Sequence, residues 1–245
     1  MKKYFVTIAI AFLFYSFIIP DKITLWLCGD STMSVKAIKA FPETGWGMPF
    51  VYFWDSTIMV KNLAKNGRST KTFIAEKIWQ NVIDSVRNGD YVFIQFGHND
   101  EVEEKKDRYT TPEEFKRNLL KFVNETKLKK GIPILLTPVS RRKFDSLGNA
   151  ENTHFVYSNL VREVAKSENV LWIDLDQKSK ELFQALGEEK SKLLFLQLKQ
   201  NEHPNYPNGK IDNTHFNELG ARMIAEIVLA EVVKLNTNLN NHIVN

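Results

Sequence analysis

The 245-residue sequence is poor in the residues that build disulfide scaffolds and metal centres. It contains one cysteine, Cys28, so no intrachain disulfide can form. Its five histidines fall into no Cys/His cluster and no His-Glu-x-x-His motif, so we expect no metal and no cofactor. Cys28 lies in an apolar run, where a small buried core residue is a better interpretation than a reactive thiol.

The chain also lacks a strong excess of either charge. Lys and Arg total 33 and Asp and Glu total 29, which gives a formal net charge of +4. So small an excess gives no argument for nucleic-acid binding, and we expect none. With 43% hydrophobic and 25% charged residues, the composition excludes a disordered or collagen-like chain and is ordinary for a globular protein.

One uncharged apolar run, residues 4–19, stands behind Lys2 and Lys3. About 16 residues match the core of a signal peptide better than a full membrane span. The chain has no clear small-x-small cleavage site before Pro20, so residues 1–20 are either a cleaved signal peptide or a retained N-terminal anchor. In both cases we expect an exported protein, periplasmic or extracellular. We expect no stable membrane insertion after export unless the uncleaved segment retains the protein.

Residues 21–245 contain no internal repeat and no low-complexity linker, so we expect a single domain there. Apolar strand-like runs alternate with amphipathic helix-like segments, which is typical of a parallel sheet with helices on both faces. Near-continuous apolar runs suit strands that are buried on both sides. The strand candidates are Ile23–Cys28, Ile58–Leu63, Tyr91–Phe96, Ile132–Thr137 and Val170–Asp174. The expected fold class is therefore α/β.

Four segments are predicted to be helices. Thr111 and Pro112 have the capping chemistry of a helix start, and Gly131 is expected to end that helix. Other helices are expected at about 72–87, 153–166 and 217–235, the last with Leu219 and Ile224 on its apolar face. Residues 186–210 are predicted to form a long loop with helical pieces, and loops of this length are often functional.

Polar residues with catalytic chemistry follow the strand candidates. Ser31, Gly67 and Asn99 each come after one of these runs, and the carboxyl ends of parallel strands meet at one ligand-binding edge. Asp212 and His215 open the expected last helix, and their spacing lets the carboxylate reach the imidazole. A serine is activated when a histidine takes its proton and an acid orients that histidine. We therefore predict Ser31 as nucleophile, His215 as base and Asp212 as the orienting acid.

Gly67 and Asn99 are candidate oxyanion donors, together with the backbone N–H of Ser31. Glycine lets its N–H approach a ligand closely, and the asparagine amide is a neutral donor. Taken singly, each residue also has an ordinary explanation: a helix N-cap for Ser31, a turn for Gly67, a loop cap for Asn99. Asp212 and His215 are in the same way explained as a helix-entry acid and a surface histidine. The Gly-x-Ser-x-Gly elbow is absent around Ser31, so the α/β-hydrolase fold is not the pattern.

In their order along the chain, these blocks resemble the SGNH, or GDSL, hydrolase superfamily from Ile23 to about Leu235. Its four named residues correspond to Ser31, Gly67, Asn99 and His215. Within it, the sequence looks most like the rhamnogalacturonan acetylesterases of carbohydrate-esterase family 12. The blocks are Gly29-Asp30-Ser31-Thr32, Gly45-Trp46-Gly47, Asn66-Gly67-Arg68-Ser69, Gly97-His98-Asn99-Asp100, Thr137-Pro138-Val139 and Asp212-Asn213-Thr214-His215-Phe216. The resemblance implies a flavodoxin-like three-layer α/β/α sandwich with a central five-stranded parallel sheet, and a hydrolase of O-acetylated pectin.

Trp46, Arg68 and His98 are the candidate substrate-binding residues. Trp46, between two glycines, either stacks on a sugar or belongs to the core. Arg68 either meets a galacturonate carboxylate as a bidentate partner or is a solvated surface residue. His98 either faces the substrate or points inward as a structural residue. Arg141 and Arg142 follow another strand end and either add positive charge to the same rim or form a solvated face.

Three functions fit these observations. The first is a monomeric carbohydrate O-acetylesterase whose partner is an acetylated polysaccharide, rhamnogalacturonan above all. The second keeps the machinery and acts on another acetylated glycan such as xylan, or on a lipid or thioester acyl group. The third is a catalytically silent glycan-binding module, against which the intact set of Ser31, Asp212 and His215 argues.

Overall fold

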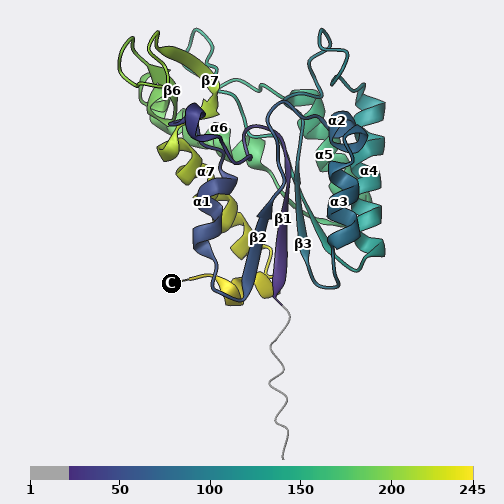
Figure 1. Cartoon of the computed structure of the whole chain (residues 1–245). Coiled ribbons are helices and arrows are strands. Elements are labelled where there is room, and N and C mark those ends of the chain that lie inside the picture. Colours follow the sequence, from purple (N-terminus) through teal and green to yellow (C-terminus); the bar gives the residue numbers. More distant parts are fainter. Residues whose placement is uncertain (1–21, 245) are drawn as a thin grey trace, which may run out of the picture.

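A five-stranded parallel sheet lies between two layers of helices (Figure 1). The computed structural model describes residues 22–244, in which the strand order is β2-β1-β3-β4-β5 and every adjacent pair is parallel. The strands are β1 Ile23–Gly29, β2 Ile58–Asn62, β3 Tyr91–Gln95, β4 Ile132–Leu136 and β5 Leu171–Ile173. The expected α/β/α fold is confirmed, and each strand ends within one residue of its predicted bounds.

The leader expected in residues 1–20 lies outside the described residues, so export stays a prediction. Within residues 22–244, none of the helices is both long enough and apolar enough to cross a bilayer.

The two faces of the sheet carry different helices because the side chains of each strand alternate between them. In β1, Leu25 and Leu27 belong to the core on one face, while Trp26 and Cys28 belong to the core on the other. Burial also raises the pKa of the Cys28 thiol, which fits the interpretation of Cys28 as a core residue. Figure 1 shows the helices as two groups, one on each side of the sheet. The first face carries α1 (Gly47–Phe50), α6 (Leu175–Ser191) and α7 (Glu218–Lys234); the second carries α2 (Thr70–Ala75), α3 (Ile78–Ser85), α4 (Pro112–Leu128) and α5 (Phe155–Ser167).

The α4 helix begins as its sequence predicts and ends differently. Thr111 accepts a hydrogen bond from the backbone N–H of Glu114 at 3.2 Å, and Pro112 is the first helical residue. At the other end, Lys130 rather than Gly131 takes the left-handed conformation, with φ at 59°. Gly131 instead donates its backbone N–H to a carbonyl of the last helical turn.

Two further helix predictions were wrong in detail. The single helix expected at 72–87 is divided into α2 and α3, because Lys77 between them is left-handed with φ at 58°. In α7 the buried face does not include Leu219, whose side chain is 53% exposed. A Cβ on Gly220 would lie 2.0 Å from the Leu194 carbonyl oxygen, so the helix approaches its neighbour through a residue without a side chain.

Residues 186–216 differ most from the prediction. Beyond the end of α6 the chain forms β6 (Phe195–Leu198), which pairs antiparallel with β7 (Lys210–Phe216). Asp212 and His215 therefore lie in a strand and do not open the last helix. Leu196 is opposite Asp212 while Phe195 is opposite Phe216, so residues 213–215 bulge from the ladder, and a bulge of this kind bends the strand.

Short 3-10 turns complete the described chain, at Ile38–Ala40, Val51–Phe53, Lys192–Leu194 and Asn238–His242.

Trp46 is fully buried, so its interpretation as a sugar-stacking residue was wrong. Its flanking glycines serve packing, since a Cβ on Gly45 would lie 2.1 Å from a backbone oxygen. The indole Nε1 of Trp46 donates to Gln95 Oε1 at 2.7 Å, and Gln95 Nε2 donates to Thr32 Oγ1 at 2.6 Å. Thr32 Oγ1 then donates to Asp30 Oδ1 at 2.8 Å. This buried relay connects the core to the loop that carries Ser31.

The relay predicts unequal effects of two Trp→Phe substitutions. Trp46→Phe leaves the side-chain amide oxygen Oε1 of Gln95 buried without a hydrogen-bond donor, which costs about 1–3 kcal/mol of unfolding free energy. Trp54→Phe is the matched control, because the buried Nε1 of Trp54 has no partner among the described residues. Urea unfolding should therefore show Trp46→Phe to be less stable than Trp54→Phe by about that amount. Equal losses of unfolding free energy would contradict the relay.

Candidate active site

One cleft of about 480 Å³ collects the residues that the sequence singles out as catalytic. Its wall includes Ser31, Gly67 and Asn99 from the loops after β1, β2 and β3, and Asp212 and His215 from β7. A larger hollow of about 1280 Å³ beside the β6–β7 ribbon has none of these five residues in its wall. Chemistry rather than size therefore identifies the smaller cleft as the candidate site.

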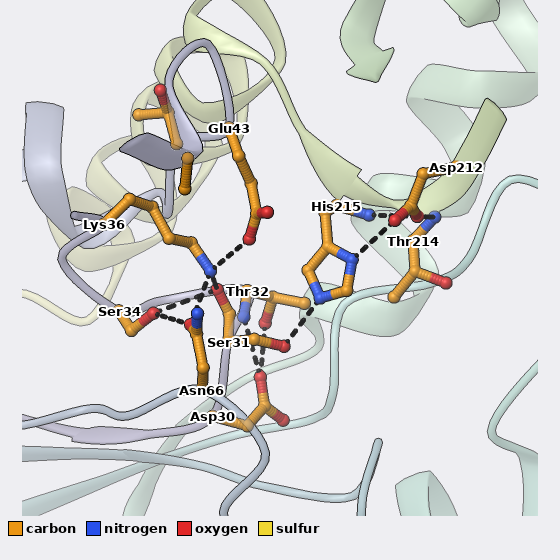
Figure 2. Close-up of polar contacts among 12 residues, drawn as sticks. Asp30, Ser31, Thr32, Ser34, Lys36, Glu43, Asn66, Asp212, Thr214 and His215 are labelled. Atoms are coloured by element: carbon orange, nitrogen blue, oxygen red, sulfur yellow. Dashed lines mark hydrogen bonds and ion pairs between the residues drawn. The ribbon is translucent and has the colours of Figure 1, made fainter. Parts of the chain in front are cut away.

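Ser31, His215 and Asp212 form a continuous hydrogen-bonded chain (Figure 2). Ser31 Oγ lies 2.9 Å from His215 Nε2, although the two residues are 184 positions apart in sequence. On the other side of the ring, His215 Nδ1 lies 2.9 Å from Asp212 Oδ2. With the proton on Nδ1, the imidazole donates to the carboxylate and Nε2 accepts from the serine hydroxyl.

The bulge in β7 orients the Asp212 carboxylate. Its Oδ1 accepts from the backbone N–H groups of Thr214, at 2.8 Å, and His215, at 3.0 Å. Partial burial raises the pKa of Asp212, but the hydrogen bonds from the ring and backbone of His215, the charge of that ring and the Thr214 N–H together hold it well below its ordinary value. Asp212 is therefore ionised and acts as a hydrogen-bond acceptor beside the imidazole.

Three N–H donors belong to residues of the same cleft wall. Gly67 has φ at 77°, a left-handed conformation that glycine adopts without strain. Within residues 22–244, the backbone N–H groups of Ser31 and Gly67 donate to no acceptor. Asn99 Nδ2 donates one hydrogen to the Arg68 carbonyl oxygen at 2.9 Å, which fixes the amide and leaves its second hydrogen available.

Asp100 fixes the loop of Asn99 to the loop of Gly67. Its Oδ1 accepts from both the backbone N–H (2.9 Å) and the hydroxyl (2.6 Å) of Thr70 at the start of α2, and from Thr110 Oγ1 at 3.0 Å. Burial raises the pKa of Asp100 to about 7, against the lowering effect of these hydrogen bonds. The two candidate oxyanion loops are thus connected behind the cleft.

A buried lysine that the sequence analysis did not single out, Lys36, holds the backbone of Ser31 on the side away from His215. Lys36 is 8% exposed, and its Nζ donates to the Ser31 carbonyl oxygen at 2.5 Å and to Asn66 Oδ1 at 2.7 Å. The ammonium also pairs with Glu43 at 2.7 Å. Burial lowers the pKa of Lys36, and the hydrogen bond and charge of Glu43 oppose that shift. In Figure 2, Lys36 and His215 approach Ser31 from opposite sides.

Comparison with known protein families identifies the group to which this fold and site belong. The GDSL-like Lipase/Acylhydrolase family matches residues 29–223. The chain belongs to this family. It is accordingly a carboxylic ester hydrolase.

Two curated relatives of this GDSL-family chain come from Bacillus subtilis (strain 168). One, named rhamnogalacturonan acetylesterase RhgT, is 39% identical over 91% of this chain and 94% of its own length. The other, named probable rhamnogalacturonan acetylesterase YesY, is 33% identical over 90% of this chain and 97% of its own length.

Solved structures similar to this GDSL-family fold include two bacterial proteins. The Bacillus subtilis protein YxiM superposes with a TM-score of 0.76 at 24% identity, over 89% of this chain and 58% of that one. A catalytic mutant of Axe2, an acetylxylan esterase from Geobacillus stearothermophilus, superposes with a TM-score of 0.63 at 19% identity, over 86% of this chain and 94% of that one. At these identities the likeness establishes the fold alone.

Of the three substrate-binding candidates in this GDSL-family chain, only His98 lies in the cleft wall. Trp46 is core. Arg68 is not in the cleft wall and pairs with Glu76 at 3.0 Å, which fits its interpretation as a surface residue. His98 is buried, and its ring centroid lies 4.2 Å from that of His154. Burial lowers the pKa of His98 well below its ordinary value, helped by the charges of nearby cationic groups, so its imidazole is neutral.

The consecutive arginines Arg141 and Arg142 both hold the β7 bulge. Arg141 lines the cleft, and its Nη1 donates to Thr214 Oγ1 at 2.9 Å while it pairs with Glu101 at 3.2 Å. Arg142 is buried, and its Nη1 donates to Asn213 Oδ1 at 3.0 Å. The sequence suggested either a cationic rim or a solvated face for both arginines. Arg142 lies in neither, because it is buried.

The buried ammonium predicts a catalytic effect of Lys36→Met. Without it, the Ser31 carbonyl and Asn66 lose their common anchor, and Glu43 loses its partner. Because small displacements of a reacting group are costly, kcat for p-nitrophenyl acetate should fall on the order of 10- to 100-fold. Lys39→Met, at an exposed lysine three residues on, is the control and should change kcat by less than about twofold. A Lys36→Met protein that is folded and fully active would contradict this role.

Proposed function

We propose that the protein is a serine esterase that removes O-acetyl groups from a plant cell-wall polysaccharide, chiefly rhamnogalacturonan. The observation that carries the proposal is the hydrogen-bonded chain of Ser31, His215 and Asp212 in a cleft whose wall also contains Gly67 and Asn99. That chain is the arrangement in which a serine hydroxyl becomes a nucleophile.

In the first half of the proposed reaction, Ser31 Oγ attacks the acetyl carbonyl carbon while His215 Nε2 takes the hydroxyl proton. Asp212 holds the ring through Nδ1–H and stabilises the imidazolium that forms. The oxyanion of the tetrahedral intermediate accepts from the N–H groups of Ser31 and Gly67 and from the amide of Asn99. Each such donor typically contributes about 10²–10³ in rate.

His215 then returns the proton to the sugar oxygen, which leaves as a hydroxyl group while the acetyl group stays on Ser31. In the second half, His215 takes a proton from water, and the resulting hydroxide attacks the acetyl-enzyme carbonyl carbon. Collapse of this second intermediate releases acetic acid, with the proton from His215 restored to Ser31 Oγ. The cycle consumes one water and needs no other reactant.

The substrate class is supported by the relatives and by the cleft wall. The two curated relatives named as rhamnogalacturonan acetylesterases align over nine tenths of the chain. Apart from Gly67, Val102 is the one residue without a polar side chain among the wall residues that the structure describes. A long lipid acyl chain needs an extended apolar channel, whereas an acetyl group at the edge of a polar cleft does not. We further propose that the enzyme acts as an exported monomer, a prediction that rests on the N-terminal sequence and the single domain.

The proposal predicts that Ser31→Ala abolishes acetate release from acetylated rhamnogalacturonan. The substitution removes the nucleophile but leaves the core intact, so kcat should fall by at least about 10³ with an unchanged circular dichroism spectrum. Ser56→Ala, at an exposed serine outside the cleft wall, is the matched control and should keep wild-type activity.

Acetate release is measured on acetylated rhamnogalacturonan and acetylated xylan in parallel. Comparable turnover by Ser31→Ala and wild type would refute Ser31 as the nucleophile. If the wild-type enzyme prefers acetylated xylan, the esterase mechanism still holds, but the substrate is acetylated xylan and not rhamnogalacturonan.

A further inference from the structure

Arg108, to which the sequence gives no role, lies in the cleft wall beside Gly67. The Cβ that Gly67 lacks would lie 3.3 Å from Arg108 Nη1, so the guanidinium packs against the turn whose N–H is a candidate oxyanion donor. The backbone N–H of Arg108 donates to the Lys105 carbonyl oxygen at 3.0 Å, and the two residues share one turn of the loop after β3.

The Arg108 guanidinium has no acid partner within residues 22–244, where its half-buried side chain forms no ion pair. Its Nε is shielded from solvent and has no acceptor among these residues. A shielded N–H without an acceptor is costly, so the side chain keeps binding capacity that the described protein does not use. The neighbouring arginines differ, because Arg68 is paired with Glu76 and Arg141 with Glu101.

The other charges of the cleft wall are compensated inside the protein. The pairs are Glu43 with Lys36, Arg141 with Glu101, and Asp212 with Lys210 at 3.7 Å. Arg108 and the exposed Lys105 are left as two positive charges at one side of the cleft, in the turn next to Gly67. A ligand that complements this side carries a negative charge in the same cleft as the ester that reacts at Ser31.

We infer that Arg108, assisted by Lys105, binds a carboxylate of the substrate and makes the enzyme selective for acetylated polyuronates over neutral glycans. This inference rests on the proposed function and assigns its specificity to named residues. Guanidinium binds carboxylate in a planar, bidentate geometry, and Lys105 adds a point charge. In rhamnogalacturonan the galacturonate units supply such a carboxylate.

The test measures how oligosaccharides of deacetylated rhamnogalacturonan inhibit the hydrolysis of p-nitrophenyl acetate. Arg108→Gln should raise the inhibition constant of these oligosaccharides about 10- to 100-fold, because a charge-assisted hydrogen bond is lost. Arg68→Gln removes an equal charge forty residues earlier, where the guanidinium is paired outside the cleft, and should change the constant by less than about twofold. Carboxyl-reduced oligosaccharides of the same length should inhibit wild type and Arg108→Gln equally.

Three outcomes overturn the inference. The first is an inhibition constant that Arg108→Gln does not raise, and the second is a wild-type enzyme that the acidic oligosaccharides do not inhibit. The third is an equal loss of affinity for the acidic and the reduced oligosaccharides, which would mean that Arg108 only shapes the cleft. Arg108→Lys keeps the positive charge but loses the bidentate geometry of the guanidinium, so it should give an intermediate inhibition constant. It replaces Arg108→Gln as the test if that variant does not fold. Failure of the proposed function gives a different result: the wild-type enzyme would then release no acetate from the acetylated polymer.

Discussion

The hydrogen bond between Ser31 Oγ and His215 Nε2 is the contact on which the rest of the site depends. It joins the loop after the first strand to a ribbon near the end of the chain, so it exists only when the whole sheet is assembled. The parallel strands bring the loops of Ser31, Gly67 and Asn99 to one edge, and the antiparallel β6–β7 ribbon carries His215 over that edge. Without the β6–β7 ribbon, the five-stranded sheet would still position Ser31 and the oxyanion candidates, but it would lack the base His215.

Both sides of this contact are held by cations that lie behind the reacting groups. Lys36 fixes the Ser31 carbonyl, and the consecutive Arg141 and Arg142 fix the bulge between Asp212 and His215. Buried charges cost desolvation free energy and stabilise little unless their partners are well placed. Their concentration here is therefore better explained by the precision the site needs than by stability. Arg108 differs from them because its guanidinium makes neither an ion pair nor a hydrogen bond to an acceptor within residues 22–244, which suits a group that binds a ligand.

The sequence alone predicts the five strands and the residues at their ends because both are local signals. Apolar runs mark the strands, and Ser31, Gly67 and Asn99 follow them directly. The β7 strand was missed because its residues are mostly polar and a proline-rich loop precedes it, so neither apolar alternation nor length reveals it. For Trp46 and Arg68 two interpretations stayed open, because local sequence does not show whether a side chain points into the core, the cleft or the solvent. Lys36 and Arg108 look like surface residues, and only partners distant in sequence, or their absence, show their roles.

The account's central claim is that His215 makes the hydroxyl of Ser31 nucleophilic. The most direct measurement is the reaction of the protein with a fluorophosphonate, followed by intact-mass and peptide mass spectrometry. A serine activated in this way attacks phosphorus and keeps the phosphonyl group, since an ordinary serine hydroxyl is too weak a nucleophile to do so. The account predicts one adduct per chain, on the peptide that contains Ser31, formed together with loss of esterase activity. An active enzyme that forms its adduct on another residue, or is fully modified at Ser31 without losing activity, would contradict it.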